Sequence, residues 1–254
     1  MSDDWDFYVL RVDDQPASIM VDLGIRPSVP LKTHNFMGYM RTKMNDPQSN
    51  GLSSQEEFQT LCDIRDAVEN TLSAKGDAHI YVGRNTSDGN RDFYFYTASL
   101  DKLHRCLDTV VKAFPQYEFT LGGREDADWS IYLDFLHPSP SDKQRMMDRR
   151  VCEQLREHGD DLSIPREIDH RVYFSDKSAV KQYEDYLREN NYVKIEIGKT
   201  KPMFGQLFID FKHVGTPEDV SDIVYDLSAK AMELGGEYDG WGCGVVAGEA
   251  GTVH

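Results

Sequence analysis

The sequence predicts an α+β fold made of two ferredoxin-like sandwich domains in tandem. The elements expected in residues 36–122 follow the order β-α-β-β-α-β, and the same order recurs in residues 167–246. This order is typical of a split-βαβ, ferredoxin-like sandwich. A chain of 254 residues is long enough for two domains of ordinary size. The proline-rich stretch HPSPSD separates the two series, which predicts domains at residues 1–138 and 139–254.

The first domain is expected to begin with a hairpin that precedes its β-α-β-β-α-β series. Residues 5–12 and 19–25 are strand-like runs around a turn. Residues 36–44 alternate in the manner of a strand. Ser53, followed three residues later by Glu56, forms a capping box that predicts the start of the first helix.

A second hairpin and a second helix are predicted next. Asp88-Gly89 is a strong turn signal between the strand-like runs 79–84 and 91–98. Ser99 is expected to cap the helix that follows. Apolar residues recur on this helix with a helical period: Leu103, Cys106, Leu107, Val110, Val111 and Phe114.

Two further segments complete the first domain, and a helix opens the second. Residues 117–122 are expected to form a strand, and the aromatic segment 129–138 a short helix that packs on the sheet. Pro140, preceded by a serine and followed by Asp142, marks the start of a helix that should reach about residue 158. The buried line of this helix is expected to be Met147, Val151 and Leu155.

The second series is predicted from alternating strands and well-capped helices. Thr216, Pro217 and Asp219 together give one helix start of particular strength, and Gly235 is the natural end of that helix. The expected elements are strands at 167–174, 192–198 and 205–214, helices after Ser175 and Thr216, and a closing strand within 235–246.

The closing stretch, GGEYDGWGCGVV, has glycines on alternate positions at 240, 242 and 244. In an extended strand this spacing removes the side chains from one face. Under one interpretation the bare face lies beneath a helix and Trp241 is a core anchor; under the other, this strand also forms a recognition surface. Asp239 and Trp241 are expected to point to the same side. The candidate partner-binding residues are Glu237, Tyr238, Asp239, Gly240 and Trp241.

Charge and hydropathy narrow the classes of partner. The net charge is −16, both halves are acidic, and no run of Lys and Arg offsets this. Phosphate backbones are bound by neutralising cations, so direct binding of nucleic acid is not expected, whereas docking onto a basic protein surface is. The sequence shows no apolar run of membrane-spanning length and no signal-peptide pattern, which predicts a cytoplasmic protein without a membrane partner. The oligomeric state is left open.

The common catalytic and cofactor motifs are missing from the sequence. It contains no P-loop, GxGxxG, GxSxG or HExxH motif, and no two histidines share a metal-ligand spacing. The four cysteines are scattered and are expected to be free thiols. His170 lies on the apolar side of its strand, where a hydrogen-bonded core or interface histidine is expected rather than a catalytic one. These observations predict a non-enzymatic protein without catalytic residues, metal or cofactor.

An alternative function lies in the first domain. Arg84, Asp88 and Arg91 flank or form the predicted hairpin turn, and an anion could bind between the two arginines, near Trp129. A plain solvated hairpin explains the same residues. A pocket that gathers these four side chains would favour a small-ligand or enzymatic role.

The EYDGWG motif at 237–242 resembles the regulator of ribonuclease activity B family. The similarity extends over roughly residues 141–247 and includes HRVYFSDKSAVKQYEDYL and AKAMELGGEYDGWG. The resemblance implies an acidic bacterial protein that binds and inhibits ribonuclease E. Two features differ from the family pattern: this chain ends in AGEAGTVH soon after Val246 instead of in a long acidic tail, and it has an N-terminal companion domain.

The first domain resembles a bacterial family known only as domain of unknown function 695. The similarity rests on YVGRNTSDGNRDFYFYT at 81–97 and DADWSIYLDFLHPS at 126–139. It implies no activity. The sequence therefore predicts a regulatory protein that binds another protein, with ribonuclease E or a related RNA-decay enzyme as the partner that the resemblance suggests.

Overall fold

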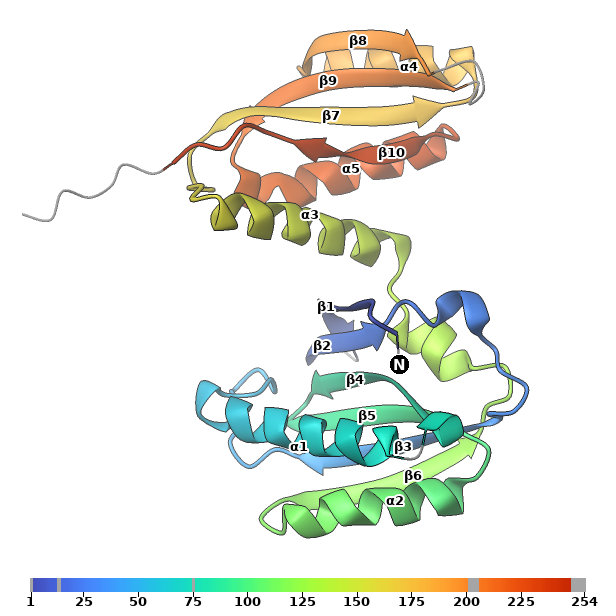
Figure 1. Ribbon diagram of the computed structural model, residues 1–254. Helices are drawn as coiled ribbons and strands as arrows, with labels where there is room; N and C mark the ends of the chain where they lie inside the picture. The colour runs from blue at the N-terminus through green and yellow to red at the C-terminus, as the bar shows by residue number, and fades with distance from the viewer. Residues whose placement is uncertain (1, 13–14, 75, 201–205, 248–254) are drawn as a thin grey trace, which may run out of the picture. The chain divides into compact units, whose positions relative to one another are not determined.

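The computed structural model describes residues 2–12, 15–74, 76–200 and 206–247. The chain divides into two compact units, Met1–Ser139 and Pro140–His254, and each is described by itself. Each unit holds one antiparallel sheet with helices (Figure 1). The predicted α+β class and the tandem arrangement of two domains are therefore confirmed.

The first unit is built on a six-stranded sheet with the order β1-β2-β4-β5-β3-β6, in which all neighbours are antiparallel. The predicted leading hairpin, β1 and β2, extends the sheet beside β4. Its second strand was predicted at 19–25 but runs from Gln15 to Asp22, because residues 15–18 pair with β1 instead of forming the turn. The strands are β1 (Trp5–Val12), β2 (Gln15–Asp22), β3 (Phe36–Lys43), β4 (His79–Ser87), β5 (Asn90–Thr97) and β6 (Glu118–Glu125).

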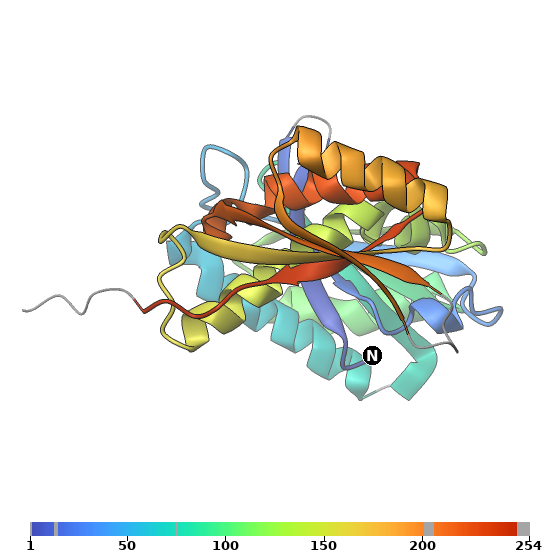
Figure 2. The same ribbon diagram turned by 90° about the horizontal axis from the view of Figure 1, so that it is seen from above.

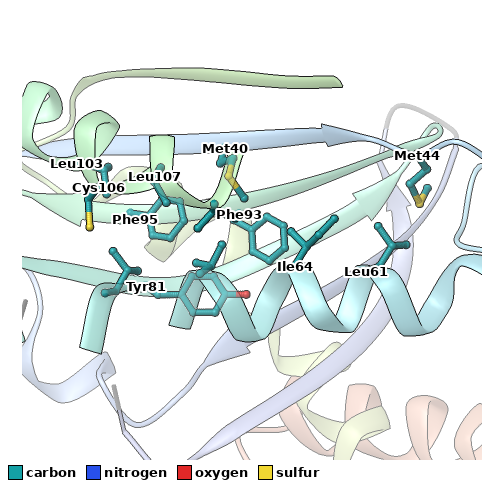
Figure 3. Packing of buried hydrophobic residues seen from close by; sticks show 13 residues of the cluster. Met40, Met44, Leu61, Ile64, Tyr81, Phe93, Phe95, Leu103, Cys106 and Leu107 are labelled. Carbon is teal, nitrogen blue, oxygen red and sulfur yellow. The ribbon is translucent and has the colours of Figure 1, made fainter. Parts of the chain in front are cut away.

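Two helices, α1 (Gln55–Ser73) and α2 (Leu100–Ala113), cover one face of this sheet and enclose the core drawn in Figure 3. Ser99 caps α2 as predicted. The predicted capping box of α1 is displaced by one residue, because Ser54 accepts from the Glu57 N–H. The Glu57 carboxylate binds the N–H groups of the preceding loop instead, so the first turn of α1 is anchored to residues 45 and 46.

The other face of the first sheet is covered by the short π-helical segment η3 (Ile131–Leu136), within the predicted aromatic helix. Trp129, just before it, is fully buried and stacks on Tyr96 with ring centroids 3.8 Å apart. Tyr96 also donates to Asp126, which caps the segment by accepting from the backbone N–H groups of Ser130 and Ile131. Two 3-10 turns complete the unit, η1 (Arg26–Ser28) and η2 (Gly76–Ala78).

The second unit has a four-stranded antiparallel sheet with the order β10-β7-β9-β8, whose twist is visible in Figure 2. In both sheets the first and third strands of the β-α-β-β-α-β series are neighbours, β3 beside β5 and β7 beside β9. The ferredoxin-like assignment itself stays a prediction. The elements are α3 (Pro140–Glu157), β7 (Arg166–Phe174), α4 (Lys177–Glu189), β8 (Val193–Lys199), β9 (Leu207–Gly215), η4 (Pro217–Asp219), α5 (Val220–Glu233) and β10 (Glu237–Gly242). The first residue of the strand predicted at 205–214 lies outside the described residues. So does most of the C-terminal AGEAGTVH.

The helices of the second unit lie on one face of its sheet. Side chains from α4 and α5 pack on the inward residues of β7 and β9. The predicted buried line of α3 is wrong for Met147, which is 48% exposed. The buried residues are Met146, Asp148, Cys152 and Leu155, so the packed face is rotated and includes a carboxylate. Among the described residues, no helix has the length and apolar character needed to cross a membrane.

Candidate functional site

A β-bulge decides how the EYDGWG motif is presented. The strand β10 lies at the edge of its sheet, and its pairing with β7 shifts register between Tyr238 and Gly240. The extra residue is Asp239. Gly240 has φ +143°, a backbone conformation that residues other than glycine rarely adopt. Tyr238 and Trp241 consequently lie opposite inward-facing residues of β7. The prediction that Asp239 and Trp241 share a side is wrong, because the bulge adds one residue to the alternation.

The bare face of β10 is open. A Cβ added at Gly240, Gly242 or Gly244 would meet no heavy atom within 4 Å. The interpretation that a helix lies against these glycines is therefore wrong. Two of them border a shallow hollow of about 380 Å³ on the sheet, lined also by residues of β7, β9 and β10: Asp169, His170, Arg171, Asp210, Asp239 and Trp241.

A paired arginine fixes the shape of this hollow. Arg171 donates from Nε and Nη2 to the two oxygens of Asp210, both at 2.7 Å. The bidentate pairing raises the pKa of Arg171. The guanidinium also lies over the Phe208 ring, 4.8 Å from its centroid. Phe208 finds room because Gly198 is opposite, where a Cβ would lie 2.2 Å from the ring.

The helix-free face around the hollow is acidic on the side of β10. Lys212 binds Asp169 at 2.7 Å, which neutralises one acid of β7. Glu237 and Asp239 are exposed and make no ion pair within the described part of the chain. This face, which we call the acidic face, consists of Glu237, Asp239, Asp169, Arg171, Asp210 and Lys212.

Trp241 points away from the acidic face toward the helices, and it lies half-buried. Its indole Nε1 donates to Asp148 Oδ1 at 2.9 Å, and the ring packs against the apolar clusters of α3 and α5. Gln144 donates to the same oxygen at 2.9 Å, whereas Asp148 Oδ2 has no hydrogen-bond partner among the described residues. Asp148 is only 2% exposed, and burial raises its pKa. Trp241 thus fastens β10 to α3.

Tyr238 also points inward, where it ends a chain of hydrogen bonds. Its hydroxyl lies 2.7 Å from His170 Nδ1, and His170 Nε2 lies 2.7 Å from Nδ1 of His213. Burial, with a smaller contribution from His213, lowers the pKa of His170 to about 3. His170 is therefore a neutral, hydrogen-bonded core histidine, as predicted.

No group of three or more metal-ligating side chains occurs among the described residues.

The four residues proposed for a ligand site in the first unit do not form one site. Phe95 belongs to the core under α1 and α2, and Arg91 alternates onto that same face of β5. Trp129 stacks on Tyr96, which belongs to the opposite face. Asp88 is exposed in the turn. Only Arg84 and Arg91 share a face, because Arg84 pairs with Phe93 across the strands.

Sequence reasoning missed Asp148, Arg171 and Asp210. Asp210 and Arg171 occupy outward positions of their strands, a signal visible in the sequence, but their pairing depends on the register between β7 and β9. Asp148 lies within the charged stretch DKQRMMDRR, where nothing local distinguishes it from its solvated neighbours.

The fold and this site define a protein of two α+β units, the second of which presents an acidic sheet face. Residues 3–137, more than half of the chain, match the model of a family of unknown function, DUF695, and the chain belongs to this family. Residues 145–243 match the model described as regulator of ribonuclease activity B. Both resemblances predicted from the sequence are confirmed.

Comparisons with individual proteins add no function. No curated protein sequence matches the chain significantly. A crystal structure described as that of a glycine cleavage system transcriptional repressor is 5% identical, with 82% of this chain and 98% of that chain covered and a TM-score of 0.26. An unknown protein from Galdieria sulphuraria is 13% identical, with coverages of 81% and 96% and a TM-score of 0.22. Scores this low carry no argument.

Proposed function

We propose that this protein binds a ribonuclease through its C-terminal unit and modulates its activity without itself catalysing a reaction. The observation that carries the proposal is the family match over residues 145–243, which runs from α3 to the end of β10. Ribonuclease E or a related RNA-decay enzyme of the bacterial cytoplasm is the partner we infer from the resemblance of EYDGWG and its surroundings.

The acidic face supports a partner of this kind on physical grounds. An enzyme that binds RNA presents Lys and Arg to the phosphates. Exposed carboxylates such as Glu237 and Asp239 can pair with the same cations. The Arg171–Asp210 pair holds the centre of the face in one geometry, so little side-chain entropy is lost there on docking. The acidic face would then occupy a basic surface of the ribonuclease.

The proposal divides the predicted partner-binding residues into two groups. Glu237, Asp239 and Gly240 belong to the open face and would touch the partner. Tyr238 and Trp241 point inward, toward His170 and Asp148, and would hold β10 in place. Their contribution to binding would therefore be indirect.

Binding of the full chain to purified ribonuclease E, measured by biolayer interferometry at low and high salt, tests the proposal. We expect binding that weakens as salt rises, because the attraction is between charged surfaces. Asp239→Lys should weaken binding. Glu189→Lys, an exposed acid of α4 away from the acidic face, is the matched control and should not. Absence of binding at low salt would refute the ribonuclease E assignment.

A further inference from the structure

The core of the N-terminal unit contains an arginine for which the described residues supply no counter-ion. Arg91 is 4% exposed, and its Nε donates to Thr86 Oγ1 at 3.0 Å. Its Nη1 is buried and finds no hydrogen-bond partner in the part of the chain that the structure describes. A buried guanidinium without an anion is unfavourable, because the lost hydration is not replaced. Such a group points to a ligand that the chain itself does not supply.

Two more arginines surround this position. Burial and the nearby charge of Arg84 lower the pKa of Arg91 to about 10, and Arg65 adds to the repulsion. Arg65 is engaged by Asp66 at 2.6 Å and by Glu69 at 3.9 Å. Arg84 makes no ion pair within the described ranges of the chain. The protein as a whole has a net charge of −16, but the three arginines outnumber by one the two acids that pair with Arg65.

Two hydroxyl groups nearby also lack hydrogen-bond partners within the described ranges. Tyr81 is 1% exposed, its hydroxyl makes no hydrogen bond, and it lies within range of the charges of Arg84 and Arg91. Figure 3 shows this hydroxyl directed along α1 toward Ile64. Thr42 pairs directly across from Arg91, and its buried Oγ1 is also without a partner. The guanidinium can only donate, and both hydroxyls can donate as well as accept, so a ligand with several acceptor atoms would satisfy all three groups at once.

We propose that Arg91, Arg84 and Tyr81 form a binding site for a small oxyanion, a phosphate or carboxylate group, between β4, β5 and α1 of the N-terminal unit. An oxyanion supplies several acceptor atoms and a negative charge, and its geometry matches the guanidinium fork. The site is separate from the acidic face and does not depend on the ribonuclease proposal.

Calorimetric melting of the full chain in phosphate, in succinate and in chloride at matched ionic strength tests this site. We expect one oxyanion, or both, to raise Tm with saturation, by roughly 5–10 °C at 100 times its Kd, whereas chloride does not. A response to phosphate alone or to succinate alone identifies the class of ligand.

Variants locate the effect. Arg91→Met should abolish the anion-dependent shift while leaving Tm in chloride unchanged or higher, because it removes an unpaired buried charge. Arg84→Gln should reduce the shift and serves as the second test if Arg91→Met does not fold. Arg124→Gln, an exposed arginine of β6, is the matched control and should keep it. A Tm that responds equally to all three anions, or a shift that survives in both Arg91→Met and Arg84→Gln, would overturn the proposal.

Discussion

Trp241 and Asp148 are joined by a hydrogen bond of 2.9 Å that ties the edge strand β10 to α3. The carboxylate is buried, and a single oxygen, Oδ1, accepts from both Trp241 and Gln144. The second oxygen, Oδ2, accepts no hydrogen bond from any residue that the structure describes. The bond therefore positions the strand that carries the acidic face, at the cost of one poorly compensated buried charge.

Asp148→Asn should stabilise the protein at pH 7. The amide oxygen can still accept both hydrogen bonds, while the buried charge is removed. Because the folded-state pKa of Asp148 is raised, its contribution to stability is fully present below the unfolded pKa of about 3.9 and is lost as pH rises through the folded pKa. Chemical denaturation of both proteins between pH 4 and 8 should show a gain in the variant that grows with pH. A variant less stable than wild type at pH 7 would contradict this account of the site.

Trp241→Phe should reduce stability by about 1–3 kcal/mol, since an aromatic ring remains but part of the indole's packing area and its charge-assisted N–H donor to Asp148 are lost. Urea denaturation measures the change. In the Asp148→Asn background the same substitution should cost less, because a neutral amide depends less on that donor. Equal costs in the two backgrounds would show that the hydrogen bond contributes little.

His170 should make the second unit sensitive to acid. Its pKa is lowered from the ordinary value near 6.5 to about 3, so the unfolded chain binds a proton that the folded chain excludes. The stability from His170 is present above pH 6.5 and is lost as pH falls toward 3, by up to about 1.4 kcal/mol per pH unit. Tyr238, His213 and Phe211 are the groups that surround it. The free energy of unfolding, measured by denaturation at several pH values between 3 and 6.5, should fall more steeply with decreasing pH in the wild type than in His170→Gln. The same pH dependence in both proteins would exclude His170 as the cause.

The two units should fold independently. Residues 1–138 and 139–254, expressed separately, are each expected to give a cooperative thermal transition, because each encloses its own apolar core. Differential scanning calorimetry tests this. If neither fragment unfolds cooperatively, the predicted division between a residue 1–138 domain and a residue 139–254 domain is wrong.

Local signals in the sequence predicted much of the fold. The helical period of Leu103, Leu107 and Val110 identified the buried face of α2, because a 3.6-residue repeat depends only on neighbouring turns. The Asp88-Gly89 turn was equally local, and both residues have positive φ.

The candidate site could be predicted only in part, because its geometry depends on distant contacts. The sequence identified the motif in β10, but the bulge at Asp239 arises from pairing with Arg171 and Val172, and one extra residue reverses the side on which Asp239 lies. The buried position of Asp148 likewise depends on a partner 93 residues away. The alternation of residues along one strand predicts neither the pairing of β10 with β7 nor the hydrogen bond between Trp241 and Asp148.

Cleavage of a defined RNA by ribonuclease E, followed with increasing amounts of the full chain, tests the central claim most directly. We predict that the wild type slows cleavage in a saturable manner, that Asp239→Lys does so less effectively, and that Glu189→Lys acts like the wild type. Anisotropy of the same labelled RNA should show no binding by the protein alone at physiological salt, which separates an effect on the enzyme from sequestration of the substrate. A cleavage rate unchanged by the wild-type protein, or slowed only in proportion to its own binding of RNA, would contradict the account.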